Sequence, residues 1–352
     1  MLVDDRLKVL LVDSGHALGA ALCQALRRLG ADVTCLGEMP AEAAGARGVW
    51  GRRDRPQDWR ALAGQEFDAV VDFGARGLEG SGQVAGPLRH RAGLVVQVGT
   101  WRVYGGARDV GDPAGDGRVA AEEAGMPVPC PESAPLRDGV ALGAEDGLWN
   151  ARAGGGYPAT VLRLAPLYGP GVRLAREWHC VGRLRAGRTR LALPDGGGQL
   201  LHRLYVDNAV HAILMAMNHP READGHAFNV GDSRVPSLAA LVAGCARALD
   251  ADMEALPVPS ALLPPSCPWA VSHPVVLDLH RLRARLGYLE PVDPDLGLER
   301  TVRWLADLPE DEILPTLDPY WRRFGHGHDY AAEDLALARW AAYRAAGARR
   351  PG

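Results

Sequence analysis

The sequence predicts a doubly wound α/β fold, in which a Rossmann-like parallel sheet carries helices on both faces and a smaller lobe follows. Three observations predict it. Short apolar runs alternate with helical periodicity from residue 8 onward, the runs are apolar throughout, and turn residues separate them. Strands of this kind suit a parallel sheet that is buried on both faces. A chain of 352 residues is long enough for two such units, since domains of about 150 residues are common.

The first elements form a βαβ unit. The run KVLLVD (8–13) is the first strand, ALGAALCQALRRLG (17–30) is a helix, and ADVTCL (31–36) is the second strand. The helix carries apolar residues on one face and ends at Gly30, a residue typical of the position after a helix. This spacing predicts parallel pairing of the two strands.

The remaining elements of this unit follow the same alternation. They are a helix at 56–64, a strand at 67–74, a helix at 83–91, a strand at 93–100, a loop rich in Gly, Pro and Asp at 105–137, a helix at 140–153 and a strand at 158–164. We expect the ligand site at the carboxyl ends of these strands, where open α/β sheets bind their ligands.

The second half mixes short elements. The pattern predicts helices at 172–186, 207–217 and 237–249, a hairpin with the turn PDGGG at 194–198 and an amphipathic helix at 330–350. A Pro-rich stretch at 257–274 separates the first three helices from the segments LDLHRLRARLGY (277–288) and LGLERTVRWLADL (296–308). We therefore divide the chain into a Rossmann-like domain (1–165), a mainly substrate-binding lobe (166–310) from which some segments return to the sheet, and a C-terminal extension (311–352).

Composition limits the classes of partner. Lys+Arg number 39 and Asp+Glu 43, so a net charge of −4 argues against nucleic acid and against an anionic membrane surface. The six cysteines include no C-x-x-C pair, and no stretch of about 18 apolar residues occurs. These features favour a cytoplasmic protein with reduced thiols, without a membrane partner. Lys8 is the single lysine in the chain.

Six segments, in order, resemble the extended short-chain dehydrogenase/reductase superfamily, the NAD-dependent epimerase/dehydratase group. They are GTWRVYGG (99–106), LRLAPLYGPG (162–171), RLYVDNAVHAI (203–213), FNVGD (228–232), RLRARLGY (281–288) and RTVRWL (300–305). The resemblance covers about residues 7–310. It implies a Rossmann-like fold and activity on a small molecule, and it implies a homodimer by analogy.

The resemblance also implies an NAD(P) site in the loop after the first strand. Family members use a Gly-x-x-Gly-x-x-Gly turn, because glycines let backbone N–H groups approach the pyrophosphate. Here Asp13 and His16 stand at the first two glycine positions, and Gly19 stands at the third, while Gly15 offers a shifted turn. We assign Gly15, His16 and Gly19 to this site and expect NAD(P) binding to be weakened or lost.

The adenosine contacts are altered as well. The acidic residue expected at the end of the second strand is replaced by Leu36 and Gly37, with Glu38 one step beyond. The adenine-side aspartate appears as Arg52 in GRRDR (51–55). An arginine there suits the 2′-phosphate of NADP, so Arg52 is a candidate cofactor residue.

The family's proton relay is a Ser/Thr, a Tyr and a Lys four residues after the Tyr, in which the lysine lowers the tyrosine pKa. Thr100 stands on the Ser/Thr position, and the Tyr and Lys positions are expected at Leu142 and Asp146. Because Lys8 lies at the start of the first strand, this chain cannot use the relay. Thr100, Tyr104 and Asp146 are the candidate catalytic residues.

Three further residues are candidates for substrate binding. Asp72 ends a strand, and His202 and Arg203 precede YVDNA, where relatives bind polar groups of the substrate. Asp13 is equally suited to capping the first helix. An ion pair of Arg203 with Asp207 or Glu299 is the alternative to an anion-binding role for this arginine.

Two other patterns contain chemically capable residues. Trp178-His179-Cys180 brings a thiol next to an imidazole, but adjacent helical residues point about 100° apart. His326, His328 and Asp329 resemble metal ligands by type, without a second ligand cluster. We therefore predict no metal site and no Cys/His nucleophile.

The function that these observations favour is redox-neutral tailoring of a small molecule of sugar or secondary metabolism, by isomerisation, elimination or cyclisation. Two alternatives stay open: a non-catalytic binding or scaffold protein on the same fold, and an unorthodox NADP-dependent reductase. The RNA-binding relatives of the superfamily in chloroplasts are a poor match, because this chain has a negative net charge and no basic stripe interleaved with aromatic residues.

Overall fold

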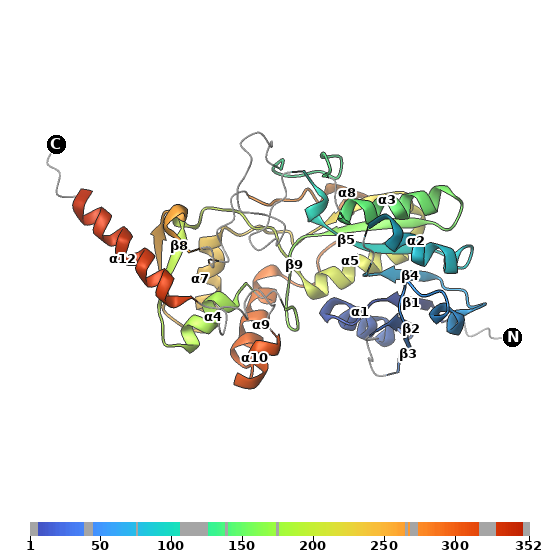
Figure 1. Ribbon diagram of the computed structural model, residues 1–352, viewed down its shortest axis with the longest axis horizontal. Helices are drawn as coiled ribbons and strands as arrows, with labels where there is room; N and C mark the ends of the chain where they lie inside the picture. Colours follow the sequence, from blue (N-terminus) through green and yellow to red (C-terminus); the bar gives the residue numbers. More distant parts are fainter. Residues whose placement is uncertain are drawn as a thin grey trace.

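The structure, a computed structural model, describes most of the chain. The described residues are 6–38, 45–74, 77–105, 126–137, 140–173, 176–264, 267, 274–316 and 329–347. Figure 1 shows a sheet unit beside a smaller lobe, from whose far side the last helix extends.

The sheet unit contains a seven-stranded parallel sheet in the order β10-β6-β5-β4-β1-β2-β3. Its strands are β1 (Lys8–Val12), β2 (Asp32–Gly37), β3 (Arg47–Trp50), β4 (Ala69–Asp72), β5 (Val95–Thr100), β6 (Ala159–Leu164) and β10 (Ala227–Val230). The strand order reverses between β1 and β4. Because β10 comes from the second half of the chain, the two halves share one sheet.

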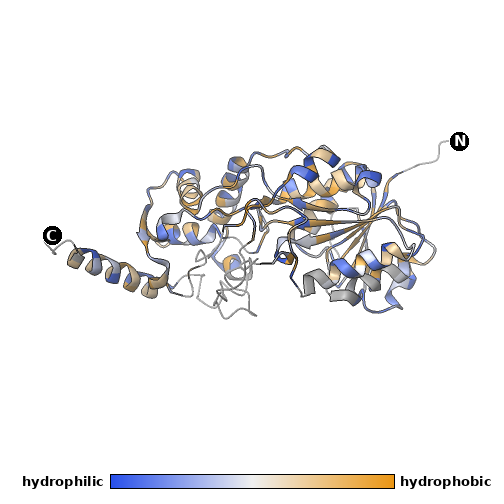
Figure 2. Ribbon diagram, turned by 90° about the horizontal axis from the view of Figure 1, so that it is seen from above, coloured by the Kyte–Doolittle hydropathy of each residue, from blue (hydrophilic) through white to orange (hydrophobic). Residues whose placement is uncertain are grey.

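Helices cover both faces of the sheet, and each face buries its own core. One core is formed with α1 (Ala17–Arg28) and α5 (Val206–Asn218), the other with α2 (Gly77–Leu88) and α3 (Val140–Ala153). Figure 2 shows these helices on the two sides of strands that are largely hydrophobic. The predicted doubly wound α/β fold is therefore confirmed.

The structure differs from the prediction at three elements of this unit. The expected helix at 56–64 is a short 3-10 helix, η1 (Asp58–Leu62), and strand β3 (Arg47–Trp50) was not predicted. Only Val49 of β3 is buried, so this edge strand lacks the continuous apolar run that identifies the others. The helix expected at 83–91 begins earlier, at Gly77.

The smaller lobe has a separate hydrophobic core. It is built on α4 (Trp178–Arg185), β8 (Arg190–Pro194), α7 (Leu238–Ala248), β11 (Glu254–Val258) and α9 (Pro294–Ala306). The hairpin expected at 194–198 does not form: β8 pairs in parallel with β11, and residues 195–197 form a 3-10 turn, η3 (Asp195–Gly197). The partner of β8 is distant in sequence, so local turn residues predicted the wrong pairing.

Short elements complete the chain. They are 3-10 helices η2 (Trp101–Val103) and η4 (Ser260–Leu262), strands β7 (Leu167–Tyr168) and β9 (Leu204–Tyr205), and helices α6 (Pro220–Ala223), α8 (His280–Leu286), α10 (Glu310–Thr316) and α12 (Tyr330–Gly347). Helix α12 lies where an amphipathic helix was predicted. Among the described helices, none combines the length and the apolar character needed to cross a bilayer.

Candidate functional site

The carboxyl edge of the sheet holds most of the polar residues that the sequence singled out. The loop after β1 begins at Asp13, β4 ends at Asp72, and the segment after β3 contains Arg52 and Arg53. Since the strand order reverses between β1 and β4, the carboxyl ends of these two strands are the expected ligand position of the fold, and we call this position the crevice.

The loop after β1 has the backbone shape of a glycine turn without its first two glycines. Asp13 has φ 58°, a left-handed conformation that glycine adopts most readily. Gly19 retains a packing role, because a Cβ there would lie 2.1 Å from the Ser14 carbonyl oxygen. His16 is the N-cap of α1, and its Nδ1 accepts a hydrogen bond from Gly19 N–H at 3.3 Å. One N–H group at this helix terminus is thus bonded within the protein.

Arg53 lies between the carboxylates of Asp13 and Asp72, and we call these three side chains the crevice network. Arg53 Nη1 donates to Asp13 Oδ2 at 3.1 Å and to Asp72 Oδ1 at 2.7 Å, and its Nη2 donates to Asp72 Oδ2 at 2.7 Å. Nη2 also donates to the Gly80 carbonyl at 2.7 Å. A Cβ at Gly74 would lie 1.9 Å from Asp13 Oδ2, so these side chains pack directly against the end of β4.

The three side chains of this network differ in how far they are exposed to solvent. The side chain of Asp72 is 3% exposed, that of Arg53 11% and that of Asp13 30%. Burial raises the pKa of Asp13 above its ordinary value, and the nearby Asp72 adds to this, although Arg53 opposes it. Asp13 is therefore the member of the network that both reaches solvent and holds a proton more readily than a free aspartate.

Arg52 points the other way from Arg53. It is exposed, forms a two-point contact with Asp54 at 2.9 and 2.8 Å, and lies 3.6 Å from Glu38. The two consecutive arginines of GRRDR therefore have different environments, one buried between acids and one at the surface. The sequence could not distinguish them, because the direction of each side chain depends on a turn after the short strand β3.

Thr100 is the last residue of β5, and Tyr104 follows it closely in the chain. The two side chains differ in their exposure to solvent. Thr100 is half-buried and caps η2, with Oγ1 accepting a hydrogen bond from Arg102 N–H at 3.3 Å. Tyr104 is fully buried. Its hydroxyl donates to Asn229 Oδ1 at 2.5 Å and accepts from Arg163 Nη1 at 3.1 Å. Burial raises the pKa of Tyr104 to about 12. Of these two candidate residues, only Thr100 is partly exposed.

Asp146 is exposed on α3, whereas its neighbour Glu145 is buried. Glu145 forms a two-point ion pair with Arg163, with Arg163 Nε 3.0 Å from Oε1 and Nη2 2.7 Å from Oε2. The buried carboxylate of this segment is therefore Glu145, which the sequence pattern did not single out. Its pairing with an arginine on β6 is a tertiary contact that local periodicity does not reveal.

His202 and Arg203 are buried just before β9, and among the described residues no hydrogen bond or ion pair joins them to Asp13, Arg53 or Asp72. His202 Nδ1 accepts from Leu277 N–H at 2.9 Å, and Nε2 lies 2.8 Å from the Asp232 carbonyl, to which it donates. Burial lowers the pKa of His202 to about 4. Arg203 forms its ion pair with Glu177, so the expected partners Asp207 and Glu299 were wrong.

Neither of the other two candidate patterns forms a site among the described residues. His179 and Cys180 are adjacent on α4 and both buried. His326 and His328 lie outside the described residues, and within the described residues no group of three potential ligands is placed to hold a metal ion. All six cysteines are among the described residues and are buried as free thiols.

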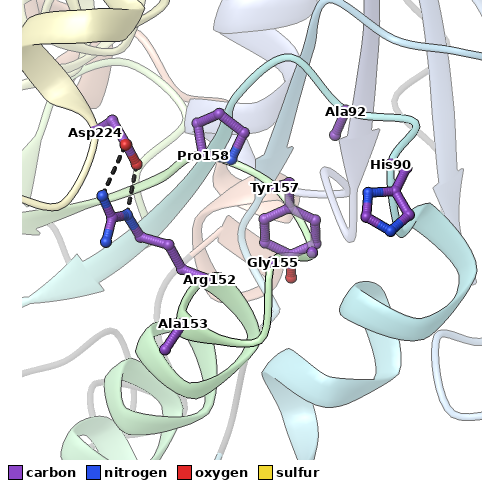
Figure 3. Close-up of a pocket in the computed structure, with 9 residues that line it drawn as sticks. His90, Ala92, Arg152, Ala153, Gly155, Tyr157, Pro158 and Asp224 are labelled. Carbon is purple, nitrogen blue, oxygen red and sulfur yellow. Dashed lines mark hydrogen bonds and ion pairs between the residues drawn. The ribbon is translucent and has the colours of Figure 1, made fainter.

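A pocket of about 610 Å³ opens at the opposite, amino-terminal edge of the sheet. Figure 3 shows Arg152 paired with Asp224 on one side of it and Tyr157 and His90 on the other. The Arg152 pair is bidentate, at 2.6 and 2.8 Å, and Asp224 also accepts from Ala159 N–H. Its charges are thus already matched within the protein.

Comparison with known proteins supports the fold assignment. Of solved structures, UDP-glucose 4-epimerase from Thermotoga maritima matches with a TM-score of 0.65 at 18% identity, covering 85% of this chain and 98% of the epimerase. The Bordetella bronchiseptica enzyme WbmG, solved with NAD, matches with a TM-score of 0.66 at 17% identity, covering 86% and 96% of the two chains.

The sequence matches are shorter. Residues 142–231 match the sequence model of the NAD dependent epimerase/dehydratase family. The uncharacterized protein YbjS of Escherichia coli K12 is 29% identical over 175 residues, 42% of this chain and 50% of its own length. A Streptomyces 3-diazoavenalumate denitrifying reductase is 34% identical over 138 residues, 38% of this chain and 43% of its own length. The chain thus spans half or less of the length of these relatives.

The fold, with its strand order reversing between β1 and β4, is similar to that of solved epimerase structures. The predicted resemblance to the NAD-dependent epimerase/dehydratase family is confirmed, with the family's sequence pattern in residues 142–231 and its fold over about 85% of the chain.

Proposed function

We propose that this protein is a redox-neutral enzyme on an epimerase/dehydratase fold, which isomerises, eliminates from or cyclises a small polar molecule without hydride transfer to NAD(P). The observation that supports it most strongly is Arg53, held between Asp13 and Asp72 in the crevice beside β1 and β4. These three charged side chains lie at the carboxyl ends of the strands, the position at which this type of fold binds a dinucleotide.

The residues present do not fit a dinucleotide. Asp13 brings a carboxylate to the turn that would approach a pyrophosphate, and two like charges in a partly buried site repel. Gly19 N–H, a donor at the start of α1, is bonded to His16 instead of being free for a phosphate. Displacing Arg53 would leave Asp72 buried without its partner, which is costly.

Other groups at the same edge can transfer protons. Asp13 is partly exposed with a raised pKa, and His16 is exposed beside it with its ring against Phe73, at 4.9 Å between centroids. Thr100 adds a half-buried hydroxyl at the end of β5. We propose Asp13 and His16 as the acid–base groups and Thr100 as a hydrogen-bonding residue for the substrate. Tyr104 and Asp146 suit this role less, because one is enclosed and the other faces solvent.

Calorimetric titration with NAD⁺, NADH, NADP⁺ and NADPH tests the cofactor part of the proposal, after denatured protein has been checked for carried-over nucleotide. We expect no binding at millimolar cofactor. The double variant Asp13→Gly/Arg53→Ala, which removes the carboxylate from the turn and the guanidinium from the crevice, should bind more tightly than the parent. Micromolar binding by the parent protein would contradict the proposal.

The catalytic part is tested with UDP-glucose and UDP-glucuronic acid, the sugars bound in related solved structures. We follow each by proton NMR with protein free of nucleotide. Conversion without added NAD(P), lost in Asp13→Asn and His16→Ala, would support redox-neutral chemistry. Conversion that requires added NAD⁺ would contradict it.

A non-catalytic binding protein is the second candidate, favoured by the separation of Tyr104 from solvent and of Asp146 from the crevice network. It predicts that Asp13→Asn, His16→Ala and Thr100→Ala leave every turnover measurement at background while small-molecule binding persists. An NADP-dependent reductase is the third candidate, favoured by the similarity to the Streptomyces 3-diazoavenalumate denitrifying reductase. It predicts tight NADPH binding that weakens in Arg52→Ala, since Arg52 is exposed at the end of β3.

A further inference from the structure

A second cavity lies beside helices of the smaller lobe. Its lining residues, from Tyr168 to Leu298, are distant in sequence from the crevice network. Its volume is about 370 Å³, and α7 and α9 form its walls. Leu298 on α9 packs against the core of the sheet unit and against the core of the smaller lobe, so the cavity lies where the two cores meet. Boundaries between packed units are common positions for small-molecule sites.

A buried guanidinium lines this cavity. The Arg203 side chain is 6% exposed and stacks on the Tyr168 ring, with Cζ 3.8 Å from its centroid. A guanidinium carries five N–H donors. Among the residues that the structure describes, Arg203 donates one side-chain hydrogen bond, from Nη2 to Glu177. A buried cation with most of its donors unmatched points to a ligand that supplies acceptor atoms.

The other charged side chains of the cavity differ in how far they are committed. Asp232 accepts hydrogen bonds from Tyr168 Oη at 2.7 Å, Asn208 Nδ2 at 2.9 Å and Tyr205 N–H at 3.1 Å. At the rim, Arg234 is paired with two exposed carboxylates, those of Asp293 and Asp295. The exposed Arg247 makes no ion pair or hydrogen bond through its side chain with any described residue. One cation at the rim is thus available to an anionic group.

The rest of the lining is apolar, with Val235, Pro236 and Leu241 facing Leu298. The helices approach closely, because a Cβ at Gly244 would lie 2.6 Å from Leu298 Cδ2. We infer that this cavity binds a small organic anion, a carboxylate or phosphate group attached to an apolar ring. The anion lies between Arg203 and Arg247, and the ring lies between α7 and α9.

This inference does not depend on the proposed function, since none of its residues belongs to the crevice network. Cofactor titration tests the crevice, and the experiment below tests the cavity, so failure of one leaves the other intact.

The test is calorimetry of the full chain with benzoate, and with benzamide as the uncharged control of the same shape. Two variants accompany the parent. Arg247→Gln removes the rim cation, and Ala240→Trp fills the cavity from an exposed position on α7. Both positions are exposed, so both variants should fold, which circular dichroism checks. Arg203 is left unchanged because its buried pairing with Glu177 supports the fold.

We expect benzoate to bind at least about tenfold more tightly than benzamide, because a charge-assisted hydrogen bond contributes about that factor. Arg247→Gln should weaken benzoate by a similar factor, with little change for benzamide, and Ala240→Trp should abolish both. Equal affinities for the two ligands, benzoate binding that survives Ala240→Trp, or absence of binding at millimolar benzoate would each overturn the inference.

Discussion

Glu145 and Asp146 are neighbours on α3, yet burial gives them different roles. Glu145 is 2% exposed and neutralises Arg163, which also supports the Tyr104 hydroxyl. Asp146 is exposed. Removing one partner of a buried ion pair leaves the other charge uncompensated, and this costs far more than the pair itself contributes.

We therefore expect Glu145→Gln to lower the free energy of unfolding by about 3–5 kcal/mol. The matched control Asp146→Asn should change it by less than about 0.5 kcal/mol, as is usual at exposed positions. Urea denaturation followed by circular dichroism measures both. Similar values for the two variants would show that Arg163 does not depend on Glu145.

His202 predicts a specific pH dependence of stability. Its folded pKa is lowered to about 4 by burial, below the ordinary value of about 6.5. Above pH 6.5 both folded and unfolded states hold a neutral imidazole, and the full stability is present. As the pH falls toward 4 the unfolded state binds the proton first, so stability is lost in this window.

The expected loss is about 3 kcal/mol between pH 6.5 and pH 4 from this residue. His211 and His226 also have lowered pKa values through burial, so they contribute with the same sign. The comparison with His202→Asn isolates His202: the variant is less stable at pH 7 but should lose less on acidification. Parallel pH profiles for parent and variant would contradict the assignment.

At the scale of elements, Gly19 joins the loop after β1 to α1 through packing. It was assigned to cofactor binding from its place in the glycine motif, and the structure gives it a contact of its own, since a Cβ would lie 2.1 Å from the Ser14 carbonyl oxygen. That neighbour is backbone and cannot rotate away. Gly198, in contrast, has φ −73° and no atom within 4 Å of an added Cβ.

Gly19→Ala should therefore destabilise the protein by about 1–3 kcal/mol, the usual cost of overpacking. Gly198→Ala should be neutral or stabilise by up to about 1 kcal/mol, because alanine restricts the unfolded chain. Thermal or urea unfolding of the nucleotide-free protein measures both changes without involving a cofactor. A neutral Gly19→Ala would mean that the turn can shift away from α1.

The elements that the sequence predicted best are those with local signals. The β1, α1 and β2 periodicities were visible because each element buries a continuous run or a single face. The half-exposed β3 carried no such run, and the parallel pair β8 and β11 joins segments 60 residues apart. Side-chain networks depend on such distant pairing, which explains why Arg53 between Asp13 and Asp72 could not be foreseen from GRRDR alone.

At the scale of the whole molecule, the two units are connected through shared structure. Strand β10 returns to the sheet beside β6, and Asn229 on β10 accepts a hydrogen bond from Tyr104 and donates to the Cys130 and Asp278 carbonyls. The homodimer implied by the family resemblance stays a prediction, which sedimentation of the purified protein will test. Because the two units share contacts within one chain, we expect them to unfold cooperatively.

Leu298 is the residue through which we test this cooperativity, since it contacts both hydrophobic cores from α9. Leu298→Ala removes those contacts and should cost about 2–3 kcal/mol, toward the low end for leucine truncation because the side chain is only partly buried. If the cores unfold together, far-ultraviolet circular dichroism and tryptophan fluorescence will give one coincident urea transition that shifts as a whole. Leu296→Ala, on the same helix but 41% exposed, should leave the midpoint nearly unchanged. Two separated transitions, of which the variant moves only one, would show that the smaller lobe folds independently and that the cavity between α7 and α9 belongs to it alone.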